Sequence, residues 1–201
     1  MRAAISLPVI VLMFFICSCG KDKLDGKEYI GYIENEKSPF TNSKEVDGLV
    51  FQLQYCPEEY MVLKQLKQYD VPQALIDRKK KEDAGLVFFK LRIKTAEGSD
   101  VLNYGISSQD DFYHRIDYLS YGFEENIAMV SGTDTIYPGI FQFERTYGIS
   151  PNADFIMAFD AKLEKDKEFQ VLIDDMVFSS GLLKFTYSET DIRNIPQLKT
   201  N

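Results

Sequence analysis

The chain has 201 residues, with 31 acidic and 23 basic side chains and a net charge of −8 at pH 7. Nucleic acid and anionic membrane surfaces repel an acidic domain, so we expect neither as a direct partner. One histidine and three cysteines leave too few ligands for a zinc or copper site, and no cofactor is expected.

The first 18 residues have the three parts of a secretory signal. Arg2 supplies a positive charge, an apolar run ends at Ile16, and small residues follow. This run is shorter than the roughly 20 apolar residues that a transmembrane helix needs, and Pro8 interrupts it. We therefore interpret residues 1–18 as a signal peptide that is removed.

The end of this signal, Ile16-Cys17-Ser18-Cys19, resembles the lipobox of bacterial lipoproteins. In that motif an aliphatic residue, a tolerant position and a small residue precede an obligatory cysteine. The resemblance implies that Cys19 becomes the lipidated N-terminus and that Cys17 is discarded with the signal. The alternative is a metal or redox pair, but such a pair has no further ligands nearby, and metal sites need three or four.

Residues 19–27 are charged and contain glycine, which predicts a flexible tether with nothing to bury. The stretch is similar to the Lys/Asp-rich export signals that Bacteroidetes lipoproteins carry after the lipidated cysteine. We expect an outer-membrane lipoprotein anchored by its acyl chains, with the periplasmic or surface-exposed side left open.

Residues 28–201 predict a single domain rich in strands. Alternating apolar and polar side chains, as in Phe51, Leu53 and Tyr55, indicate half-buried strands. Strands are expected at residues 29–33, 49–55, 86–94, 127–130, 136–137, 141–145, 155–159, 169–178 and 182–187.

Helices are expected at residues 57–67, 73–81 and 108–121. Pro57 and the acids after it suit a helix start, and Ser108 and Gly122 suit a cap and a stop. The second helix ends in the basic run of residues 78–81. This run either complements the helix dipole or contacts an anionic partner or lipid headgroups.

These elements predict a mainly β fold, because strands lie on both sides of the helices without regular β-α alternation. We expect an antiparallel β-sandwich with two or three short helices in its connections. Our first expectation is the immunoglobulin-like variety, without its usual disulfide or tryptophan.

No catalytic motif stands out in the sequence. Cys56 is the cysteine left in the mature chain and His114 is the lone histidine, and a buried thiol is the simpler interpretation of Cys56. Phosphate loops, dinucleotide fingerprints and nucleophile elbows are absent. Calcium would need clustered oxygens, for which the candidates are Asp110-Asp111, Asp134 and Asp174-Asp175.

The candidate binding residues are Tyr113, Tyr118 and Tyr121, which lie on or near one predicted helix. Exposed together, they would form an aromatic patch suited to a sugar. The alternative is that they pack in the core of the domain.

Segments 141–151, 174–178 and 191–196 resemble parts of uncharacterised Bacteroidetes lipoproteins. This resemblance implies a location in the cell envelope and does not imply an activity. We expect a non-enzymatic accessory or binding module for an envelope protein, a glycan or another exported polymer. One alternative is an envelope hydrolase that acts on glycan or peptidoglycan through paired carboxylates. A pure spacer is another.

Overall fold

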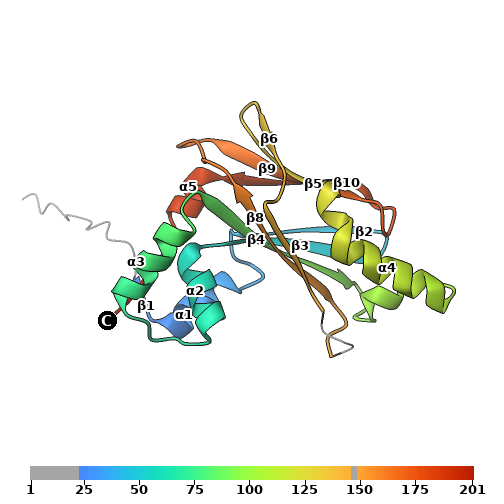
Figure 1. Ribbon diagram of the computed structural model, residues 1–201, viewed down its shortest axis with the longest axis horizontal. Coiled ribbons are helices and arrows are strands. Elements are labelled where there is room, and N and C mark those ends of the chain that lie inside the picture. The colour runs from blue at the N-terminus through green and yellow to red at the C-terminus, as the bar shows by residue number, and fades with distance from the viewer. Residues whose placement is uncertain (1–22, 146–148) are drawn as a thin grey trace, which may run out of the picture.

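The computed structural model describes residues 23–145 and 149–201, which form two packed antiparallel sheets (Figure 1). The larger sheet has the order β2 (Thr41–Val46), β3 (Leu49–Cys56), β4 (Leu86–Thr95), β8 (Ala153–Asp160) and β7 (Ile140–Glu144). The smaller sheet has the order β10 (Gly181–Ser188), β9 (Glu168–Asp175), β5 (Ile127–Ser131) and β6 (Asp134–Ile136). The expected mainly β sandwich is therefore confirmed, while its immunoglobulin-like variety stays a prediction.

The helices lie in the connections between strands. They are α1 (Gly26–Ile33), α2 (Glu58–Leu66), α3 (Gln73–Glu82), α4 (Gln109–Tyr121) and α5 (Glu189–Arg193), with 3₁₀ turns η1 (Val101–Asn103) and η2 (Phe123–Asn126). The three expected helices are confirmed as α2, α3 and α4, each within one residue at either end. The eight strands expected after residue 48 are confirmed as β3 to β10.

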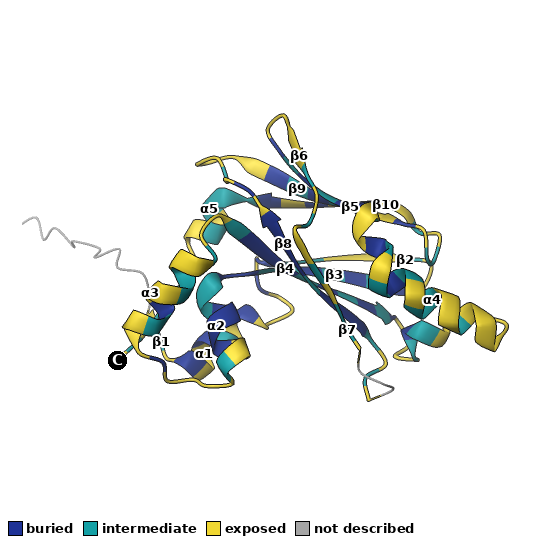
Figure 2. Ribbon diagram, viewed as in Figure 1, coloured by how far each residue is buried: buried dark blue, intermediate teal, exposed yellow. Residues whose placement is uncertain are grey.

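The main core lies between the two sheets. Alternation along β4 turns Phe89, Leu91 and Ile93 inward, where they meet inward side chains of β9 and β10. Phe89 makes ring contacts with Phe169 and Tyr187 of the opposite sheet. Figure 2 shows the buried positions concentrated on the strands where the sheets face each other.

A second core covers part of the outer face of the larger sheet. Tyr29 of α1, Leu63 of α2 and Ile76 of α3 pack with the outward-facing Phe88 and Ala158. The three helices gather at one end of the molecule, whereas α4 extends at the opposite end (Figure 1). Polar and charged side chains of β3 and β4, among them Gln52, Gln54, Lys90 and Arg92, occupy the neighbouring part of the outer face, and the candidate site lies there.

The two ends of the described chain lie side by side. β1 (Lys23–Leu24) pairs in parallel with β11 (Gln197–Leu198) next to helices α1 and α3. The flexible tether expected at residues 19–27 is therefore wrong for residues 23–27, which form β1 and the first turn of α1.

The strand expected at residues 29–33 is also wrong, because these residues belong to helix α1. Asp25 caps the helix by accepting bonds from Lys27 and Glu28, and Glu28 bonds back to the amide of Asp25. Tyr29 and Ile33, four residues apart, share the buried face of the helix. A five-residue apolar run fits either state, and here the capping box decides it.

Two glycines of α1 give a matched test of this packing. A Cβ on Gly26 would overlap the backbone carbonyl of Tyr69, whereas a Cβ on Gly31 would meet nothing within 4 Å. We expect Gly26→Ala to lower the free energy of unfolding by about 1–3 kcal/mol through overpacking. Gly31→Ala should raise it by about 0.5–1 kcal/mol, because alanine favours a helix interior. Urea unfolding of both variants checks the pair, and equal effects would contradict the close approach.

Candidate functional site

A polar cavity of about 360 Å³ lies on the uncovered part of the larger sheet, beside α2. We name it the outer-face groove, and it is lined by Glu34, Glu36, Thr41, Gln52, Gln54, Tyr60, Lys64, Lys90 and Arg92. Strands β2, β3 and β4 form its floor. Helix α2 and the connection from α1 to β2 form its wall.

Strand register brings the floor residues together. Gln52 pairs with Arg92 and Gln54 with Lys90 across β3 and β4, while Thr41 of β2 pairs with Gln54. The four positions on β3 and β4 alternate with inward apolar residues, so they point to the outer face, and Thr41 shares that face because it pairs directly with Gln54. The floor of the groove therefore presents neighbouring amide, hydroxyl and cationic groups.

Asp154 of β8 neutralises the cations of the floor. Arg92 donates from Nε and Nη2 to the two carboxylate oxygens of Asp154 at 2.7 Å each, and Lys90 Nζ lies 3.2 Å from the same carboxylate. Burial opposes ionisation of Asp154, but the bonds from Arg92 and the charge of Lys90 outweigh it and lower its pKa. Lys90 also lies 3.7 Å from Glu144.

The wall holds a second network of charges. The Oε1 atom of Glu34 accepts hydrogen bonds from the Tyr60 hydroxyl and from Lys64 Nζ, both at 2.9 Å. Burial opposes ionisation of the Glu34 carboxyl, but the hydrogen bonds from Lys64 and Tyr60 outweigh this effect and lower the pKa of Glu34. Glu36 pairs with Lys94 at 3.2 Å, and that bond lowers the pKa of Glu36.

These shifts determine what the groove can do chemically. Glu34, Glu36 and Asp154 all have lowered pKa values, so near neutral pH they accept hydrogen bonds and hold no proton to donate. Glycoside hydrolysis instead needs a carboxyl that keeps its proton. Burial raises the pKa of Glu58, but this residue begins α2 and does not line the groove. The groove is thus suited to binding a ligand through fixed donors and acceptors.

The three candidate tyrosines separate in the structure. Tyr113 and Tyr121 are 59% and 71% exposed, whereas the ring of Tyr118 is half-buried and packs 6.2 Å from that of Phe123. The expected three-residue patch is therefore wrong for Tyr118. Core packing is also wrong for the other two. Leu119 is the one buried residue of α4.

Tyr113 and Tyr121 line a shallow hollow at the exposed face of α4. His114, Asp117 and Arg145 also line it. An exposed tyrosine presents both an apolar ring and a hydroxyl, which makes this face a second surface that can contact a partner.

The structure does not bring Cys56 and His114 together. Cys56 belongs to the core under α1–α3, and His114 lies exposed on α4 at the other end of the molecule (Figure 1). The buried Cys56 thiol lies 3.7 Å from the carbonyl oxygen of Gln54. The interpretation of Cys56 as a buried thiol is confirmed.

The buried thiol should resist alkylation. Burial raises the pKa of Cys56 to about 12, and only the thiolate is nucleophilic. We expect iodoacetamide at pH 8 to leave Cys56 unmodified in the native protein and to label it fully in urea, as measured by peptide mass spectrometry. Rapid native labelling would show that the helices over Cys56 open readily.

One member of each acidic pair has a structural role. Asp111 accepts from the amide of Ser107 at the start of α4, and the Asp175 carboxylate accepts from the amides of Val177, Phe178 and Ser180. Within residues 23–145 and 149–201, no group of three or more His, Cys, Asp or Glu side chains could hold a metal ion.

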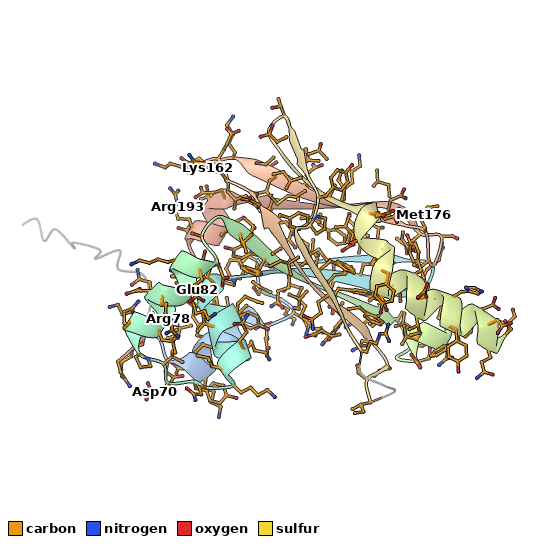
Figure 3. All side chains as sticks on the ribbon, viewed as in Figure 1. Asp70, Arg78, Glu82, Lys162, Met176 and Arg193 are labelled. Carbon is orange, nitrogen blue, oxygen red and sulfur yellow. The ribbon has the colours of Figure 1, made fainter. Side chains whose placement is uncertain are left out.

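Three of the four basic residues at the end of α3 lie close to acidic side chains. Lys79 lies 2.6 Å from Glu82, Lys80 lies 2.6 Å from Glu59, and Arg78 lies 3.8 Å from Glu82. Figure 3 shows Arg78 and Glu82 together on this helix. These pairs favour a solvated helix end over a dedicated anion site.

Searches against models of protein families, curated proteins and solved structures each returned no match.

The lipobox-like residues, including Cys17 and Cys19, lie outside the described residues. In the part of the chain that the structure describes, no helix is both long and apolar enough to span a membrane.

Sequence reasoning missed the groove, although part of its signal was readable. The segments Gln52-Leu53-Gln54 and Lys90-Leu91-Arg92 place polar residues at alternating positions in strongly apolar strands. Which of these positions meet depends on how the strands pair, and the alternation alone does not specify that register.

Proposed function

We propose that this chain is a lipid-anchored lipoprotein of the outer membrane that acts as a non-enzymatic binding module for an envelope protein or an exported polymer. The outer-face groove carries the binding part of the proposal, because it is a preformed polar cavity whose charges are paired and ionised. The lipobox-like motif ending at Cys19 supports the anchor.

The position of β1 in the fold supports a domain that is held close to a membrane. Cys19 precedes Lys23 by four residues, a span of at most about 14 Å of chain. Lys23 is held in β1 against β11, beside α1–α3. With the lipid inserted, this end of the domain faces the membrane and α4 points away from it.

The anchor predicts a clear effect of one substitution. Cys19→Ala should leave an uncleaved or mislocalised precursor, because the alanine has no sulfur to accept the lipid. The matched control is Cys17→Ser, which changes only the tolerant position and should be processed normally. Membrane fractionation and intact mass would measure both variants. Normal processing of Cys19→Ala would reject the anchor.

The binding role is tested by cross-linking on intact cells, purification of the tagged protein and mass spectrometry. A groove variant, Gln52→Ala with Lys64→Ala, is compared with Tyr113→Ala with Tyr121→Ala on α4. We expect a recurrent partner that the groove variant loses and the α4 variant keeps. If only the α4 variant loses the partner, the binding site lies on α4 and not in the groove. A wild-type protein that is purified without any partner would reject the binding role.

The hydrolase stays an alternative prediction, and one observation favours it. Burial raises the pKa of Glu58, which helps a carboxyl keep its proton. The charge of Lys80 opposes this shift, and the charge of the neighbouring Glu59 supports it. Release of reducing ends from peptidoglycan or envelope glycans, abolished in Glu58→Gln, would support this function over binding.

A further inference from the structure

We infer that the outer-face groove binds an uncharged, hydroxyl-rich saccharide. This inference rests on the proposed binding function and names the chemical class of its ligand. The first argument is the composition of the lining. Ligand sites are usually apolar with a few polar groups, but each of the nine residues that line this cavity is polar or charged. A ligand that fits must therefore present polar groups on all sides.

The second argument is charge balance. Lys64 pairs with Glu34, and Lys94 pairs with Glu36. Lys90 and Arg92 both pair with Asp154, and Glu144 lies 3.7 Å from Lys90 as a second carboxylate. An anionic or cationic ligand would compete with one partner of such a pair, and it would add a charge for which the groove has no unpaired counter-ion. A neutral ligand leaves every pair intact, so the groove favours a ligand without net charge.

The third argument is the hydrogen-bonding capacity that remains. A carboxylate has about four acceptor positions, and Glu34 uses two of them on Tyr60 and Lys64. Gln52 and Thr41 each both donate and accept. Sugar hydroxyls also do both, so a saccharide can match alternating donors and acceptors that a purely donating or accepting ligand cannot.

The fourth argument is preorganisation. The side chain of Gln54 donates to the carbonyl of Ile33, and Asp154 fixes the guanidinium of Arg92 through two bonds. The ring of Tyr60 is buried, so its hydroxyl is held in place. Groups already fixed lose little entropy on binding, which helps a ligand that relies on hydrogen bonds.

The test uses the mature protein, purified from the membrane in a detergent without a sugar headgroup. The probes are neutral hexasaccharides of glucose, the hexamer of N-acetylglucosamine, an oligogalacturonate of the same length as the charged counterpart, and a zwitterionic alanine tripeptide. Calorimetric titration to ~10 mM is needed, because a few hydrogen bonds give dissociation constants near 1 mM.

We expect at least one neutral hexasaccharide to bind, and about tenfold more tightly than the oligogalacturonate or the tripeptide. Thr41→Ala with Gln52→Ala should weaken this binding about tenfold, and Tyr113→Ala with Tyr121→Ala should leave it unchanged. If the alanine pair fails to fold, as judged by its melting curve, Gln52→Asn alone replaces it.

Three results would overturn the inference: no saccharide binding, preference for the oligogalacturonate or the tripeptide, or binding that depends on the α4 tyrosines and not on the groove. A cellular partner that depends on the groove, without saccharide binding, would reject the saccharide and leave the proposed function standing. If neither a cellular partner nor a saccharide binds, both the proposed binding function and the saccharide inference are rejected.

Discussion

Replacing Phe89 by alanine is expected to lower the free energy of unfolding by about 3–5 kcal/mol, the usual cost of removing a buried phenylalanine. The side chain is 0% exposed and lies between the sheets. Its ring lies 6.0 Å from Phe159 in its own sheet and 5.2 Å from Tyr187 in the other. The cavity would therefore remove contacts on both sides of the sandwich.

Urea unfolding followed by far-UV circular dichroism measures this loss. The matched control is Tyr113→Ala, which removes an aromatic ring that is 59% exposed and should change stability by no more than about 0.5 kcal/mol. An equal effect of the two substitutions would show that Phe89 does not couple the sheets in the way that its contacts indicate.

Asp154→Asn is expected to be the second most damaging of these changes, at about 2–3 kcal/mol near neutral pH. The amide keeps the shape of the carboxylate but leaves Lys90 and Arg92 without their shared anion. Removing one partner of a buried pair costs about 3–5 kcal/mol. We expect less here, because the Lys90 and Arg92 side chains are 21% and 37% exposed to screening water.

The effect should depend on pH with a definite sign. The folded protein lowers the pKa of Asp154 below its ordinary value of 3.8, so the carboxylate stabilises the fold above that value. This contribution is lost as the pH falls through the lowered pKa, since both states then bind the proton. The stability difference between wild type and Asp154→Asn should therefore be constant above about pH 5 and shrink toward pH 2.

Denaturant titrations at several pH values test this. Glu36→Gln is the control, because it removes a carboxylate that also pairs with a lysine of β4 but has a side chain 65% exposed. Exposed pairs contribute little, so this variant should resemble the wild type. A difference for Asp154→Asn that does not change with pH would mean that the cost arises from packing and not from charge.

Much of the fold could be predicted from the sequence, because most strands of the sandwich bury at least one face. Alternation in residues 86–94 marks β4 so clearly that its limits were predicted within one residue. Strand β2 was missed, because its sequence Thr-Asn-Ser-Lys-Glu-Val lies at a sheet edge and buries no side chain fully. An edge strand is specified by its hydrogen-bonded neighbour, and local sequence carries little sign of it.

For the candidate site, the sequence determined less and the tertiary structure decided more. The sequence alone determined the types of side chain available, the lone histidine and the single cysteine of the described chain, and the lipobox-like address that stays a prediction. Tertiary structure decided that Arg92 meets Asp154, 62 residues later, and that Tyr113 is exposed while Tyr118 is not. The reason is physical: alternation states which face a residue takes, but strand register and helix packing arise from contacts between distant segments, which no local pattern encodes.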